Sequence, residues 1–250
     1  MTIPAESRHD YKCGFATQSG RSMIEMLGVL AIIGVLSVGG IAGYSKAMSK
    51  YRINKTIEQI TLIAGNIRAF WGPQKNYLGV NCNGYSCNAS GCYGHSGVNA
   101  QGNPTAANNG CPIVKKAKIF PDEMITVTDG KIMSITNPFG GVVGLYAADK
   151  AKDGDRQAFE ISYFIGDNEE ACIELLTQDW SNANVEVIMV SCGPNNDYFK
   201  TPVAVEKAID ICDKGISDAK HYGVISAGFP VITFFFNVDP NSNVWNNKLS

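Results

Sequence analysis

One carboxylate at the edge of a long apolar run is the arrangement in this sequence most able to do chemistry. Glu25 stands five positions after Gly20, and no other charge occurs before Lys46. A helix needs about 20 apolar residues to cross the hydrocarbon core of a bilayer, and residues 26–45 supply that length. A carboxylate at the edge of lipid is costly and usually has a partner. The pattern indicates a membrane helix whose Glu25 pairs with a cation, with a carboxylate tolerated among lipid headgroups as the alternative.

Cysteines are the second group of reactive side chains. The chain has eight, and seven of them follow the apolar run. This density is typical of an oxidising compartment and favours disulfides. Three of them, Cys82, Cys87 and Cys92, recur every five residues close to His95. That spacing differs from the tight pairs of zinc ribbons, so we expect disulfides there and no metal or other cofactor.

Composition excludes several classes of function. The chain has 250 residues and a formal net charge of −2, so nothing in its charge indicates nucleic acid as a partner. Its three histidines lie outside any nucleophile or metal motif, and no glycine-rich phosphate loop follows a predicted strand. The sequence therefore predicts a protein that is not an enzyme.

The polar segment 1–20 has no apolar core of its own, so it is not a secretory signal peptide. The apolar segment that follows is expected to act as a signal anchor.

The helix is expected to continue beyond the apolar run. From residue 46 to 71 the apolar residues fall on one stripe at helical spacing, and Gly72-Pro73 ends the pattern. A helix with lipid chemistry in its first half and core-packing chemistry in its second is therefore predicted. The stripe consists of Ile53, Ile57, Ile60, Ala64, Ile67 and Trp71.

Residues 72–250 are expected to form one globular domain. It begins with a loop, 72–112, rich in Gly, Asn, Ser and Pro. Beyond the loop the sequence predicts a turn at 137–141 followed by a strand, strands over 159–165 and 185–190, a helix from 169 to about 180, a helix opened by Thr201-Pro202, and a last strand from 231. The fold class is α+β, a long N-terminal helix packed on an antiparallel sheet.

The segment from Gly20 through Glu25 into the apolar helix resembles the processing site of type IV prepilins. The order of elements in the second half is similar to that of the type IVb branch, particularly PilS-like subunits. The resemblance implies a leader, 1–20, cut by a prepilin peptidase between Gly20 and Arg21. It also implies N-methylation of the new terminus, although family members usually begin with Phe, Met or Leu, and Arg21 departs from that pattern.

The resemblance also assigns roles to side chains. Glu25 would pair with the N-terminal amine of a neighbouring subunit during assembly. Cys172 and Cys212 would form the disulfide that closes the C-terminal region, with two unlinked buried thiols as the alternative. Connectivity stays open for the other cysteines after the anchor, which are Cys82, Cys87, Cys92, Cys111 and Cys192.

The expected function is that of a structural subunit, a major or minor pilin, polymerised through its hydrophobic helix. Expected partners are copies of itself, the peptidase, an inner-membrane platform and its ATPase, and membrane lipid before assembly. The expected location is the bacterial inner membrane with a periplasmic C-terminal domain, then an extracellular pilus serving adhesion, conjugation, motility or DNA uptake. The alternatives are a type II secretion pseudopilin, a signal-anchored periplasmic binding protein that does not assemble, and, least favoured, a periplasmic enzyme.

Overall fold

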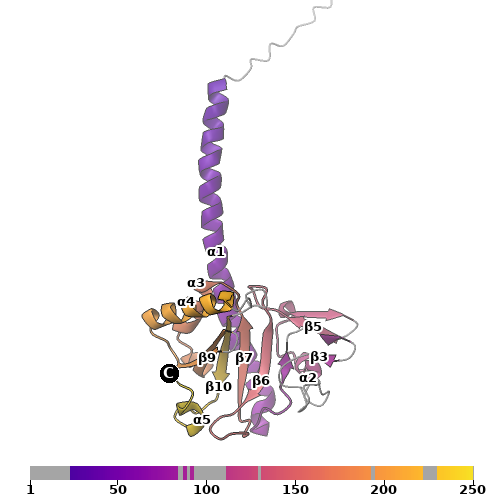
Figure 1. Ribbon diagram of the computed structural model, residues 1–250. Helices are drawn as coiled ribbons and strands as arrows, with labels where there is room; N and C mark the ends of the chain where they lie inside the picture. The colour runs from indigo at the N-terminus through magenta and orange to yellow at the C-terminus, as the bar shows by residue number, and fades with distance from the viewer. Residues whose placement is uncertain are drawn as a thin grey trace, which may run out of the picture. The chain divides into compact units, whose positions relative to one another are not determined.

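A computed structural model of the chain describes residues 23–83, 87–88, 91–92, 111–128, 131–192, 195–221 and 230–249 (Figure 1). The described residues divide into two compact units with the boundary between Ala47 and Met48. The first contains the start of the long helix α1 (Met23–Trp71) and the second contains the rest of the described chain.

Helix α1 ends where the sequence predicts it to end. It runs to Trp71 and is followed by a short 3-10 helix, η1 (Gly72–Gln74), which begins at the expected Gly72-Pro73 break. In the second unit its predicted apolar stripe is buried, except that Ile57 is only partly buried against the same core. Thr56, Gln59 and Ile63 are also buried, so the packed face is wider than the stripe alone.

Six strands of the second unit form one antiparallel sheet in the order β1-β6-β7-β10-β8-β9. The last strand of the sequence, β10, therefore lies between β7 and β8. The strands are β1 (Cys82–Asn83), β6 (Val143–Ala148), β7 (Ala158–Phe164), β8 (Val185–Cys192), β9 (Asn195–Lys200) and β10 (Val231–Phe236).

One face of this sheet forms the main core with α1. Side chains alternate along a strand, so Phe159, Ile161 and Tyr163 of β7 share that face, and all three are fully buried. They belong to the same cluster as Ile60 and Ile67 of α1. This packing matches the predicted α+β class, a long N-terminal helix on an antiparallel sheet.

Helices α3 (Glu169–Thr177) and α4 (Val205–His221) pack against each other beside β8. Asn168 caps α3 by accepting a hydrogen bond from the Ala171 backbone N–H at 2.9 Å. The start of α4 differs from the prediction. The Thr201-Pro202 bond is cis and the helix begins at Val205, so Pro202 belongs to the preceding turn rather than to the first helical turn.

The second face of the sheet is covered in part by the short helix α5 (Asn243–Asn246). Trp245 of α5 packs with Phe235, Val187 and Ala158 in a smaller apolar cluster. All six residues of β10 are buried. Both faces of the sheet are therefore covered along its central strand.

The turn before β6 follows the sequence prediction. The Asn137 side chain accepts from the backbone N–H of Phe139 and of Gly141, and its Nδ2 donates to the carbonyl of Phe164 at 2.9 Å. A Cβ at Gly141 would lie 1.7 Å from that same carbonyl oxygen. Only glycine fits where this turn meets the end of β7.

The segment 72–112 has more regular structure than its composition suggested. It contributes β1 to the main sheet and a small pair of strands, and its last residues begin a helix. That helix ends at Lys116. The remaining elements are β2 (Cys87–Asn88), β3 (Gly91–Cys92), α2 (Cys111–Lys116), η3 (Asp122–Met124), β4 (Ile125–Thr128), β5 (Lys131–Ile135) and η4 (Ser181–Ala183).

Candidate functional site

The first unit presents an apolar helix with no protein around it. Every described residue from Met23 to Ala47 is exposed, and Ile24, Leu36 and Val38 are each at least 69% exposed. The helix is long and apolar enough to cross a membrane, with a mean hydropathy of 2.2 over its most apolar stretch. So large an apolar surface is stable in lipid or against other apolar surfaces, but not in water.

Glu25 lies in the first turn of α1 and is exposed. A carboxylate is favoured at this end of a helix because the unpaired backbone N–H groups carry partial positive charge. Gly20 and Arg21, the expected processing residues, lie outside the described residues.

Cys172 of α3 and Cys212 of α4 form a disulfide, with their Cα atoms 5.9 Å apart. Both side chains are fully buried. The bond joins residues 40 positions apart and fixes α3 to α4. This is the pair that the family resemblance implied.

The other cysteines are described only in part. Cys82 is disulfide-bonded and fully buried in the main core. Cys87 and Cys92 are backbone partners in the β2–β3 pair. His95 lies outside the described residues. Within the described ranges, no group of three or more His, Cys, Asp or Glu side chains could hold a metal ion.

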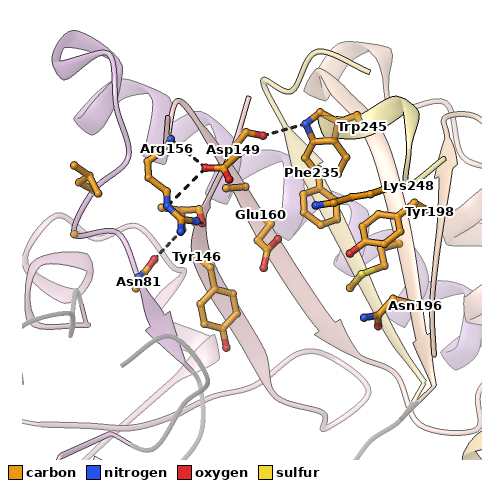
Figure 2. Close-up of a pocket in the computed structure, with 15 residues that line it drawn as sticks. Asn81, Tyr146, Asp149, Arg156, Glu160, Asn196, Tyr198, Phe235, Trp245 and Lys248 are labelled. Atoms are coloured by element: carbon orange, nitrogen blue, oxygen red, sulfur yellow. Dashed lines mark hydrogen bonds and ion pairs between the residues drawn. The ribbon is translucent and has the colours of Figure 1, made fainter. Parts of the chain in front are cut away.

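A groove on the second face of the sheet was not anticipated from the sequence. It has a volume of about 580 Å³ and runs across β6, β7, β10, β8 and β9 (Figure 2). Glu160 of β7 stands near its middle, with Tyr146 and Arg156 on one side and Phe235 and Lys248 on the other. Burial raises the pKa of Glu160 to about 7, although the positive charges of Lys248 and Arg156 oppose that shift.

The two cations of the groove have other contacts. Arg156 pairs with Asp149 at 3.7 Å, and its Nη1 donates to the Ala147 carbonyl at 3.3 Å. The Lys248 ammonium lies 4.9 Å from the ring centre of Trp245 and 5.6 Å from that of Tyr198. Trp245 is itself fixed, because its indole N–H donates to the carbonyls of Asp149 and Lys150, both at 3.0 Å.

The sequence did contain a signal for this groove. Three consecutive phenylalanines, 234–236, predict a strand covered on both faces. On the face of Phe235, the alternation of β7 places Glu160. A charged residue in such a position is surrounded by covered sheet rather than by bulk water.

Comparisons with known proteins found a matching family model and a similar solved structure. The family model described as Bundlin matches residues 95–226, which is just over half of the chain. A crystal structure of a type IVb pilin from Salmonella typhi is similar at 17% identity and a TM-score of 0.41, over 74% of this chain and 99% of that one. No curated protein has a significantly similar sequence.

The match over half of the chain defines the class of protein, a type IV pilin. The chain belongs to the Bundlin family. Pilins are structural subunits, so its role is structural rather than enzymatic. The apolar helix α1 fits a membrane-anchored pilin.

Proposed function

We propose that this pilin is made as a precursor, cut between Gly20 and Arg21, and polymerised through the apolar part of α1. The observation that carries the proposal is the exposed apolar segment of α1 with Glu25 in its first turn. A segment with no apolar contacts of its own needs lipid before assembly and neighbouring helices after it. When the subunit moves from lipid into contact with neighbouring helices, the apolar residues of α1 stay out of water throughout.

Glu25 supplies the register of the polymer in this proposal. Cleavage after Gly20 would create an α-amino group four residues before Glu25 in the mature chain. The amine of one subunit would neutralise the carboxylate of its neighbour, since an unpaired charge among apolar helices is unfavourable. A subunit added with the wrong axial stagger would leave both charges unpaired.

The proposed division of the chain follows from this use of α1. Residues 1–20 are the leader, 21–71 the pilin helix with its membrane part at 26–45 and its amphipathic part at 46–71, and 72–250 the globular domain. Disulfides form outside the cytoplasm, which supports a periplasmic location for the domain before assembly. The implied partners are a prepilin peptidase, an inner-membrane platform and an ATPase.

Two other functions use the same anchor. A type II secretion pseudopilin would be cut and assembled in the same way, but would not accumulate as an extracellular fibre. A signal-anchored binding protein would keep its leader and stay in the membrane as a single subunit. Because both would contain the apolar helix, they are distinguished by whether the native chain keeps its leader and whether it accumulates as an extracellular fibre.

The test is to shear fibres from the surface of the producing cells and determine the N-terminal sequence and intact mass of the chain. The proposal predicts an N-terminus at Arg21 and a mass lacking the 20-residue leader. An increase of about 14 Da, the net gain when a methyl group replaces a hydrogen atom, would report methylation of Arg21. Full-length chain found only in the inner membrane would contradict the proposal.

A further inference from the structure

The groove on the second face of the sheet contains a carboxylate with no direct partner in the described part of the chain. Glu160 is half-buried on β7, and no described side chain or backbone group donates a hydrogen bond to it or forms an ion pair with it. Buried or half-buried carboxylates are normally paired or hydrogen-bonded. This one is directed into the open volume of the groove (Figure 2).

Aromatic rings flank this carboxylate along the sheet. Tyr146 of β6 and Phe235 of β10 are its direct neighbours in register, one on each side. Farther across the sheet, Tyr198 of β9 packs at 6.0 Å from Phe235, and Trp245 packs at 4.8 Å from the same ring. A carboxylate surrounded by aromatic rings is a combination suited to a cation, because ring faces carry partial negative charge.

The protein's own Lys248 demonstrates that these rings accept an ammonium group. Its Nζ atom lies over both Trp245 and Tyr198. Lys248 is exposed and lies over the ring faces rather than in contact with the carboxylate. The rings of the groove therefore already bind a cation at one side, while the carboxylate at its centre forms no direct ion pair with any described residue.

We propose that the groove formed by Glu160, Tyr146, Phe235, Tyr198 and Trp245 binds an alkylammonium group, as carried by a lysine side chain or a small diamine. The ammonium would form an ion pair with Glu160, and its methylene groups would lie along the rings. The volume of about 580 Å³ is ample for a side chain of this length and falls within the usual range of small-ligand sites. This site is independent of the proposed assembly through α1.

An anion fits the groove less well. Arg156 is already paired with Asp149 and bound to the Ala147 carbonyl, and an anion reaching it or Lys248 would lie beside Glu160. Like charges so close repel in a partly desolvated site. The charge that lacks a direct partner is negative, so a cationic ligand is the one that completes the site.

Binding should depend on pH through Glu160. Burial raises the pKa of this carboxyl group to about 7. The charged or titratable groups that face it are Tyr146, Asp149, Arg156, Tyr198 and Lys248. An ammonium binds the ionised form, so its apparent affinity should fall on the order of 50-fold between pH 7 and pH 5, as the ionised fraction falls.

The experiment is calorimetric titration of the full-length chain in detergent micelles with Nα-acetyl-lysine methylamide. The control ligand is the Nε-acetylated form, which has the same stem and no charge. Saturable binding of the first and none of the second is expected. Titrations at pH 7 in buffers of different ionisation enthalpy measure the number of protons released on binding. About half a proton per ligand should be released, because binding shifts Glu160 to its ionised form.

Three variants separate the proposed contact from a general effect on the fold. Glu160→Gln should weaken binding at least tenfold and abolish the proton release, while Glu186→Gln, a half-buried glutamate outside the groove, should change neither. Lys248→Met removes the resident cation and should strengthen binding several-fold. Thermal unfolding of each variant reports whether the fold is intact.

Putrescine, titrated in parallel, distinguishes the source of the ammonium. Tighter binding of the lysine compound assigns the groove to a lysine side chain of a partner, and tighter binding of putrescine assigns it to a free diamine. Failure of both to bind the native chain, or unchanged binding to the Glu160→Gln variant, would overturn the proposal. So would binding of acetate in preference to either amine.

Discussion

Arg68 of α1 lies with its guanidinium carbon 5.5 Å from the ring centre of Phe236 on β10. The same group lies 5.8 Å from the ring of Phe159 on β7, and its Nη2 donates to the Ala183 carbonyl at 2.6 Å. Burial lowers the pKa of Arg68 from its usual value. One cation of α1 thus contacts two central strands and the turn before β8.

Replacing Arg68 tests how strongly this contact holds α1 to the sheet. Arg68→Met keeps most of the apolar stem and removes the hydrogen bonds and the cation–ring contacts. The loss should be about 2–3 kcal/mol in the free energy of unfolding, because the Ala183 carbonyl also loses its partner. Denaturant unfolding measures it. Arg52→Met, at an exposed position of the same helix, should change stability by less than about 0.5 kcal/mol.

The disulfide between Cys172 and Cys212 should contribute strongly to stability. It closes a span of 40 residues, for which the chain-entropy relation gives about 4 kcal/mol. The double variant Cys172→Ala, Cys212→Ala should therefore unfold at a markedly lower temperature, measured by circular dichroism. Hydrogen exchange should accelerate first in α3 and α4. An unchanged melting temperature in the double variant would contradict this expectation.

Glu160 should make stability depend on pH near neutrality. Its pKa is raised from 4.5 to about 7 in the folded chain, so the folded state holds a proton that the unfolded state releases at lower pH. The stabilisation is fully present below about pH 4.5 and is lost as the pH rises to about 7. Its size is on the order of 2–3 kcal/mol.

Glu160→Gln should remove this contribution. Unfolding measured at pH 5 and pH 8 should show the native chain losing more stability than the variant over that interval. Glu206→Gln, at an exposed position of α4, should leave the native pH dependence unchanged. Equal slopes for the native and Glu160→Gln chains would show that the carboxyl group titrates at its ordinary pH.

Glu25 should be required for polymer and not for insertion. Glu25→Ala removes one charge of the proposed pair and leaves a neighbouring amine unpaired among apolar helices, at a cost of roughly 3–5 kcal/mol per contact. Membrane fractions should contain normal amounts of the variant, and sheared fibres should contain little or none, as measured by immunoblotting. Glu58→Ala, which removes only the exposed ion pair with Lys55, is the matched control and should assemble normally. Normal fibres from Glu25→Ala would refute the role of this carboxylate.

The sequence predicted those elements whose patterns are local. The stripe from Ile53 to Trp71, the alternation in β7 and the turn at Asn137 each depend on spacing over a few residues. In each case the residues that produce the pattern lie within the same short segment. The long N-terminal helix, four strands and a turn were therefore found close to their observed positions.

Elements that are ordered by a partner strand rather than by their own sequence pattern were missed. β9 is polar at its start and is ordered by pairing with β8, and β4 pairs only with β5 in the described sheets. The start of α4 was predicted wrongly because Thr201 is bound to β8. The Thr201 hydroxyl donates a hydrogen bond to the Val185 carbonyl. None of these partners is visible from the segment alone.

The residues of the candidate sites also differ in how far the sequence predicted them. Glu25 and its apolar helix were visible because both lie in one short stretch, and that stretch carried the family resemblance. The groove was not, because Tyr146, Glu160, Phe235 and Lys248 come from four separate segments. Their meeting depends on the position of β10 between β7 and β8, which no periodicity predicts.

The contact between α3 and the start of the packed part of α1 has a mechanical consequence. Lys50 forms ion pairs with Glu170 and Glu174 of α3, Ser49 donates to Glu170, and the cystine continues the connection from α3 to α4. Tension reaching α1 at Lys50 would be shared with these two helices before it strains the sheet. The covalent bond is the one link in that path that cannot slip, so a reduced subunit should yield at lower pulling force than an oxidised one.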